Sequence, residues 1–195
     1  ILNESEFQMA QPVVMTSMPL NGMEAVRSRI KKDHRGSIGV AKKRGVVVSE
    51  ATSIEDYRTF YRIYLEVFRN FGTPTYGFSF FQALWQHLHP TRSVRLLLAH
   101  ANGQCIGGLL LMGHNQRLVI KFAECVPSAV KLRAYGAMYW GAIELGLGGD
   151  YTHLSFGTSH ISRPGLIEYK ERWGAQSEPV SIYSLPITKP VPSLD

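Results

Sequence analysis

The chain has 195 residues, of which 45% are hydrophobic, 11% aromatic and 18% charged; this composition excludes a disordered chain and suits one folded domain. Its longest apolar run, residues 105–112, is far shorter than the ~20 apolar residues that cross a membrane, which excludes a membrane-spanning protein. The net charge is +6, and residues 24–45 alone account for it, with eight basic residues against two acidic ones.

This basic segment favours a polyanion, an anionic membrane surface or an acidic neighbouring domain as its partner, although a solvated helix face explains it equally well. Apolar residues recur at roughly helical spacing from Met23, which predicts one basic linking helix over residues 21–45, weakened at Gly36 and Gly39. Residues 1–20 contain two prolines and no clear periodicity, so we expect them to run extended over a surface. The chain begins with neither Met nor an export signal and therefore reads as an internal segment.

Two helices are predicted after a short β-branched strand at residues 46–48. Ser53 and the acidic residues after it form a capping-box-like start for a helix that reaches about Asn70. A Gly-Thr-Pro turn separates this helix from a second one over residues 78–88. The first helix carries a largely aromatic stripe that we interpret mainly as core: Tyr57, Tyr61, Tyr64, Leu65 and Phe68.

Three strands in close succession are predicted at residues 94–100, 104–113 and 117–124. Asn102-Gly103 favours a tight hairpin and His114-Asn115 a second turn, so we expect an antiparallel meander. The remaining elements are expected to be a helix at 132–147, a strand at 151–156, a helix ending near 173 and a strand at 180–185. Periodicity alone supports a mixed α/β fold with a partly antiparallel sheet.

The element order resembles the GNAT acyltransferase fold, and four motifs resemble FemAB-type proteins of that superfamily, in particular the group associated with exosortase and exopolysaccharide systems. The motifs are Arg69-Asn70-Phe71-Gly72-Thr73-Pro74, Tyr135-Gly136-Ala137-Met138-Tyr139-Trp140, Phe156-Gly157-Thr158-Ser159 and Tyr169-Lys170-Glu171-Arg172-Trp173-Gly174. The resemblance implies a GNAT-like domain over residues 46–187, preceded by the basic helix and followed by a tail at 188–195.

The resemblance further implies a bacterial, cytoplasmic transferase built from two GNAT-like domains, of which this chain is the second and the N-terminal one is missing. Fem enzymes move an amino acid from aminoacyl-tRNA to the amine of a peptidoglycan precursor, whereas ordinary GNAT enzymes use acetyl-CoA. The donor is therefore either acyl-CoA or aminoacyl-tRNA, and the expected acceptor is an amine of a cell-envelope or exopolysaccharide precursor. Both reactions attack an activated acyl carbonyl with an amine.

Lys170 matches the lysine of the family's Phe-Lys pair, with Tyr169 in the Phe position. The resemblance places this lysine near the reaction centre, where an ammonium can stabilise an oxyanion or bind a phosphate. We expect its side chain to reach a cleft, so that removing it leaves stability nearly unchanged. The structural alternative is a surface lysine solvated by the neighbouring carboxylates.

Arg133 and Gly136, with Ala137 beside them, occupy the place of the GNAT phosphate loop, where backbone N–H groups at a helix start bind pyrophosphate. Met138 replaces the final small residue of that pattern, which weakens the case for CoA. Packing of the helix through Gly136 is the alternative explanation.

Glu124 ends the third meander strand, where GNAT enzymes often place a general base, and burial could raise its pKa. Cys125 lacks an activating partner, and we interpret it and Cys105 as reduced core residues. Arg69 and Thr73 are candidate acceptor contacts. The seven histidines show no metal-ligand spacing, so no metal is expected.

Ser155 and Thr158 replace an acid and a base that the family commonly shows around its Phe-Gly motif. This change leaves open a different class of function, a noncatalytic domain whose basic helix binds RNA or anionic lipid. The cleft discriminates the two, because an enzyme needs a pocket that joins Arg133 to Lys170.

Overall fold

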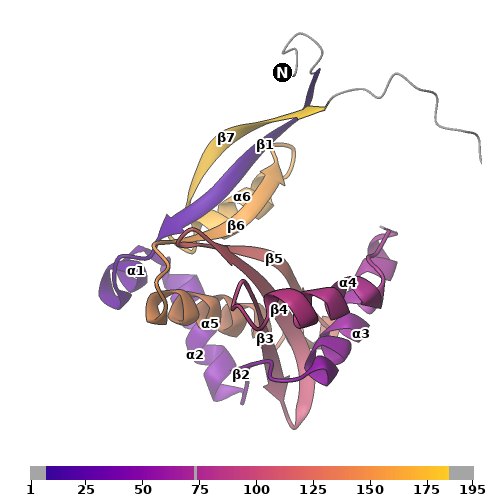
Figure 1. Ribbon diagram of the computed structural model, residues 1–195. Helices are drawn as coiled ribbons and strands as arrows, with labels where there is room; N and C mark the ends of the chain where they lie inside the picture. The colour runs from indigo at the N-terminus through magenta and orange to yellow at the C-terminus, as the bar shows by residue number, and fades with distance from the viewer. Residues whose placement is uncertain (1–7, 73, 185–195) are drawn as a thin grey trace, which may run out of the picture.

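The computed structural model describes residues 8–72 and 74–184, which form a single seven-stranded sheet flanked by helices (Figure 1). The strand order is β2-β3-β4-β5-β6-β1-β7, and every neighbouring pair is antiparallel except β5 and β6. The elements in chain order are β1 (Gln8–Pro19), α1 (Met23–Arg29), α2 (Lys32–Lys43), β2 (Val47–Glu50), α3 (Ile54–Phe71), α4 (Phe78–Ala83), the π-helical turn η2 (Leu84–Leu88), β3 (Val94–Ala101), β4 (Gln104–His114), β5 (Arg117–Cys125), the 3-10 turn η3 (Pro127–Val130), α5 (Ala134–Gly148), β6 (His153–His160), α6 (Pro164–Glu171) and β7 (Gln176–Ser184). The expected mixed, mostly antiparallel architecture is confirmed.

Strand β1 is extended, as predicted for the N-terminal segment, but it lies inside the sheet between β6 and β7 and not over a surface. Val13, Thr16 and Met18 are buried. The pairing with β6 shifts register between Met15 and Ser17, which breaks the simple alternation that marks a strand in a sequence. Residues 1–7 lie outside the described part of the chain.

The basic segment forms two helices, α1 and α2, where one was predicted. The chain leaves the helical conformation at Ile30 (φ −65°, ψ 130°), which is fully buried, and the next N–H, that of Lys31, donates to the Arg172 carbonyl at 2.8 Å. Gly36 and Gly39, the predicted weak points, both lie within α2. Burial of an apolar side chain, and not glycine, therefore sets the break.

Local signals place the central elements well. The capping box at Ser53 is present, and Gly72 ends α3 in the left-handed conformation (φ 62°). The Asn102-Gly103 hairpin turn is confirmed by its positive φ angles of 51° and 74°. The second turn is Asn115-Gln116, one residue later than predicted, since Asn tolerates positive φ more readily than His or most other residues.

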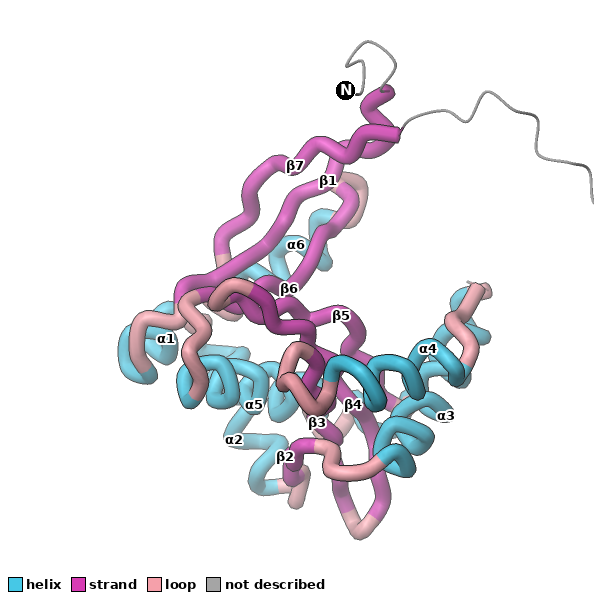
Figure 2. The backbone as a smooth tube through the Cα atoms, viewed as in Figure 1, coloured by secondary structure: helices cyan, strands magenta, loops and turns pink. Residues whose placement is uncertain are grey.

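Two apolar cores lie on opposite faces of the sheet. Helix α3, with α4 packed on it, covers one face of β3–β5; α5 covers the other, and α2 packs on α5. Figure 2 shows these two groups of helices on either side of the strands. Within the described residues, no helix is both long and apolar enough to cross a membrane.

Candidate active site

The parallel strands β5 and β6 pair along three residues, Arg117 to Val119 with His153 to Ser155, and then separate. Beyond this point a cavity of about 640 Å³ opens between α2, the start of α5, α6 and the end of β5. Its lining includes these polar and apolar residues: Asp33, His34, Ser37, Ala123, Val130, Arg133, Tyr135, Tyr139, Leu166 and Tyr169. Concave sites of this size that mix aromatic rings with a few polar groups suit small ligands.

The N-terminus of α5 borders this cavity. Arg133 stands at the N-cap in the left-handed conformation (φ 62°), and no side chain caps the helix, so the first N–H groups of α5 are free of a side-chain acceptor. Such N–H groups and the helix dipole attract anions. The predicted donor-binding residue Arg133 is thus placed at the cavity.

Gly136 has a packing role at this helix start. A Cβ atom added to it would lie 2.5 Å from the Ser37 hydroxyl oxygen of α2, so the two helices approach closely through the glycine. Ala137 is half-buried and packs on the core, and Met138, at the position where a small residue was expected, is fully buried there. Helix α2 therefore occupies one side of the predicted phosphate loop.

Glu124 lies at the end of β5 and is not itself a lining residue of the cavity; the preceding residue, Ala123, lines it, and successive side chains of a strand point to opposite faces of the sheet. Burial raises the pKa of the Glu124 carboxyl to about 7. Burial also raises the pKa of Tyr64 and of Tyr135, and the Glu124 charge raises both further. Its carboxylate has no hydrogen bond or ion pair to any residue that the structure describes.

Lys170 is buried, with 7% of its surface exposed, and does not line the cavity. Its ammonium donates to the carbonyl oxygens of Gly157 (3.3 Å) and Thr158 (3.1 Å) and to the Ser159 hydroxyl (2.8 Å). Burial lowers its pKa to about 8. The expectation of a side chain reaching a cleft is wrong, and so is the surface alternative; the preceding residue, Tyr169, faces the cavity instead.

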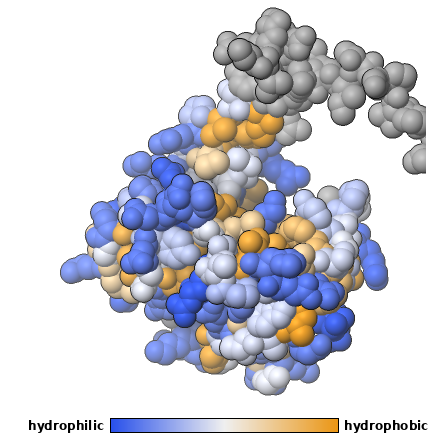
Figure 3. Space-filling view, viewed as in Figure 1, coloured by the Kyte–Doolittle hydropathy of each residue, from blue (hydrophilic) through white to orange (hydrophobic). Residues whose placement is uncertain are grey.

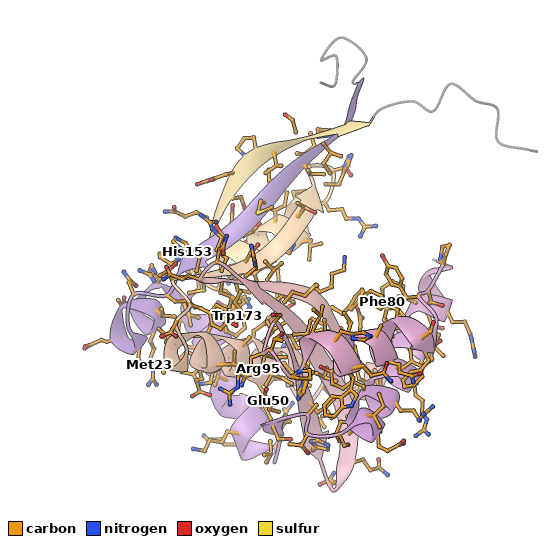
Figure 4. All side chains as sticks on the ribbon, in the orientation of Figure 1. Met23, Glu50, Phe80, Arg95, His153 and Trp173 are labelled. Carbon is orange, nitrogen blue, oxygen red and sulfur yellow. The ribbon has the colours of Figure 1, made fainter. Side chains whose placement is uncertain are left out.

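The sequence reasoning missed a polar cluster where α2 meets α6. His34, buried in the cavity wall, lies 3.0 Å through Nδ1 from an Asp33 carboxylate oxygen, and Arg172 pairs with the same carboxylate at 2.9 Å. The His34 ring is 4.9 Å from that of Tyr169 and 5.0 Å from that of Trp173, which is fully buried and labelled in Figure 4. An adjacent Asp-His pair inside a basic helix was the signal that could have pointed to it.

The family model of the acetyltransferase (GNAT) domain matches residues 27–171. The chain belongs to this family. Its structure is similar to that of FemX (TM-score 0.77, 13% identity, 90% of this chain and 61% of FemX covered). It is also similar to the C-terminal domain of a putative lysylphosphatidylglycerol synthetase from Agrobacterium fabrum (TM-score 0.67, 9% identity, 92% of this chain and 61% of that chain covered). A third similar structure is an aminoglycoside acetyltransferase from an uncultured soil metagenomic sample (TM-score 0.58, 10% identity, 71% of this chain and 95% of that chain covered).

These structural likenesses show the GNAT fold, and the chain spans about three fifths of FemX and of the synthetase structure. A search of curated protein sequences found no significant match. The narrower resemblance to the exosortase-associated group stays a prediction.

Of the other predicted site residues of this GNAT domain, those that the structure describes are not among the residues that line the cavity. Arg69 is exposed in the last turn of α3, and Thr73 lies outside the described residues. Ser155 is buried and satisfied internally, since it accepts from the Gly157 N–H at 3.1 Å, while Thr158 holds Lys170 through its carbonyl.

Burial raises the pKa of the Cys125 thiol, which fits a core residue and not a nucleophile. No group of three metal-ligating side chains gathers among residues 8–72 and 74–184.

Three arginines of the basic segment stabilise the fold. Arg29 donates to the Pro19 carbonyl at 2.7 Å, Arg35 donates to the Ile30 carbonyl at 2.5 Å, and Arg44 donates to the Lys131 carbonyl. The other five cations are exposed on α1, α2 and the junction between them: Arg27, Lys31, Lys32, Lys42 and Lys43. Figure 3 shows one face of the molecule, largely hydrophilic with apolar residues in separate patches.

Proposed function

We propose that this GNAT domain transfers an acyl or aminoacyl group from an activated donor to an amine. The observation that carries the proposal is Glu124, a carboxyl with a pKa of about 7 at the end of β5, one residue after Ala123 of the cavity that opens where β5 and β6 separate. A general base works best when its pKa lies near the working pH.

In this mechanism the Glu124 carboxylate accepts the proton that the attacking amine must lose. Tyr135 and the start of α5 face the same region and supply hydrogen-bond donors for the negative charge that develops on the carbonyl oxygen. Buried Lys170 fixes the β6 segment from Gly157 to Ser159 and adds positive charge to it. The family resemblance gives Lys170 a catalytic role; in this proposal it acts as a positioning residue through the Gly157–Ser159 segment that it holds.

The donor supplies the activated acyl group, and it is either acyl-CoA or aminoacyl-tRNA. Both carry phosphates, and Arg133 with the uncapped start of α5 fits a phosphate at the cavity. The close packing of Ser37 on Gly136 limits the room on one side of that helix start. The amine of a cell-envelope or exopolysaccharide precursor is the proposed acceptor, and Arg69 and Thr73 stay the acceptor contacts that the sequence predicts.

The test is mass spectrometry of reactions that combine the full-length protein with isotope-labelled acetyl-CoA or aminoacyl-tRNA and candidate amines. Glu124→Gln should lower kcat/KM at pH 8 by roughly 10²-fold or more and remove the rise of activity through pH 7. Glu66→Gln, which changes an exposed carboxylate on α3, is the matched control. Transfer that is insensitive to Glu124→Gln contradicts the base, and no labelled product with either donor contradicts the function.

A noncatalytic domain that binds RNA or anionic lipid is the second candidate, favoured by the five exposed cations of α1, α2 and their junction. Binding to tRNA or to anionic vesicles should weaken steeply with salt, with a log–log slope that follows the number of contacts. Lys42→Gln with Lys43→Gln should reduce that slope. Without binding at low salt, the N-terminal GNAT-like domain that the resemblance implies becomes the expected partner of these helices.

A further inference from the structure

His34 is an oriented hydrogen-bonding group in the cavity wall. Its Nδ1 lies 3.0 Å from Asp33 Oδ2, and the same oxygen accepts from Arg172 Nη2 at 2.9 Å. A carboxylate held by an arginine accepts hydrogen bonds and has none to give, so the Nδ1 atom of His34 carries the proton. In the neutral ring, Nε2 then presents a lone pair.

This Nε2 atom is buried and has no hydrogen-bond partner among the residues that the structure describes. An unsatisfied buried polar atom costs about 1–3 kcal/mol and is uncommon in folded proteins. His34 as a whole is 7% exposed, and it lines the cavity together with Tyr169 and Arg133. Because the atom itself is closed to solvent in the ligand-free wall, a ligand that brings an N–H or O–H group to this wall would satisfy it after a small shift of the His34 ring.

We propose that His34 is a ligand-contacting residue of the cavity, whose Nε2 accepts a hydrogen bond from an N–H or O–H group of the bound acyl donor, and that Asp33 is the positioning residue that fixes this tautomer. The inference rests on the proposed function. Both donors offer the required chemistry: acyl-CoA has amide N–H and hydroxyl groups, and aminoacyl-tRNA has an amine and ribose hydroxyls near the ester.

The test uses the ¹⁵N-labelled full chain and the histidine side-chain nitrogen resonances, assigned with His34→Phe. Without ligand, His34 should show a protonated Nδ1 and an unbonded Nε2. Acetyl-CoA, or a hydrolysis-resistant aminoacyl-adenosine amide, should then shift the Nε2 resonance and leave that of exposed His87 in place. By calorimetry, His34→Phe should weaken the compound that binds by roughly tenfold, whereas the control His87→Phe should not change its affinity.

Three results overturn the inference. The first is a ligand that binds, by calorimetry, without moving the His34 resonance; the proposed function then stands and His34 leaves the site. The second is an Nε2 atom already hydrogen-bonded in the free protein, which would pair it with the buried and likewise unpartnered Nε1–H of Trp173. The third is the absence of binding by either compound, which removes the donor site itself.

Discussion

The two faces of the sheet differ in how completely side chains fill the space between the sheet and the helices that cover it. On the α3 side, Tyr57, Phe60 and Phe81 are fully buried. At the β2–β3 edge of the sheet, Arg95 of β3 is bound through two hydrogen bonds to Glu50 of β2 (Figure 4). The α5 side keeps a cavity of about 640 Å³.

Lys170 of α6 is buried and Glu124 of β5 is half-buried, and neither has an opposite charge beside it among the described residues. Burial shifts the pKa of each toward neutrality, as expected for an unpaired buried charge. Ionisable groups that are buried at a cost in stability mark a candidate functional site, whereas the filled α3 side stabilises the fold.

The largest expected effect tests the filled side. Phe60→Ala removes a fully buried ring that packs against Gly108 and should lower the free energy of unfolding by about 3–5 kcal/mol. Leu166→Ala, at the cavity and 40% exposed, should change it by less than about 1 kcal/mol. Chemical denaturation measures both. Equal losses would remove the contrast between the two sides.

Lys170 should impose a pH dependence on stability. Its pKa is about 8 in the folded chain and about 10.5 when unfolded, so the unfolded state binds more protons between these values and stability rises with pH across that window. Across this window the free energy of unfolding rises by up to about 3 kcal/mol from Lys170. Lys170→Met should lack this rise in denaturation curves recorded from pH 7 to 10.5. A variant that follows the wild-type profile would show that the ammonium is solvated.

The contact between α2 and α5 is tested by a pair of glycine substitutions. Gly136→Ala forces a methyl group toward Ser37 and should destabilise the chain by roughly 1–3 kcal/mol. Gly39→Ala, where the added methyl meets nothing within 4 Å, should stabilise α2 by up to about 1 kcal/mol. Thermal unfolding distinguishes the two, and a neutral Gly136→Ala would show that α2 adjusts freely over the cavity.

The smallest effect concerns Glu124. Its raised pKa means that the folded state binds the proton more tightly than the unfolded state does. The contribution of Glu124 to the free energy of unfolding is therefore fully present below about pH 4.5 and is lost as the pH rises through about 7. We expect a decline on the order of 1 kcal/mol, reduced by the partial exposure of the residue, and its absence in Glu124→Gln. Unfolding curves from pH 4 to 8 measure it. A wild-type curve that is flat over this range would place the carboxylate in water.

Elements with local signals could be predicted from the sequence. Ser53, Asn102-Gly103 and Gly72 each act on their own neighbours through caps and positive φ angles, so their effects do not wait for tertiary contacts. Strand β1 could not be placed, because its position between β6 and β7 depends on partners 134 to 176 residues away and on a register shift.

For the candidate site, too, some features follow from the sequence and others only from the folded structure. The sequence by itself determined the order of the elements from β2 onward, the meander and the four motifs that led to the GNAT family, since these depend on residue types and their spacing. The tertiary structure alone decided that Arg133 and Tyr169 share a cavity, that Lys170 is buried outside its lining, and that Asp33 and His34 form part of its wall. The physical reason is that burial, and with it every pKa shift, is set by residues from distant segments that come together only in the folded chain.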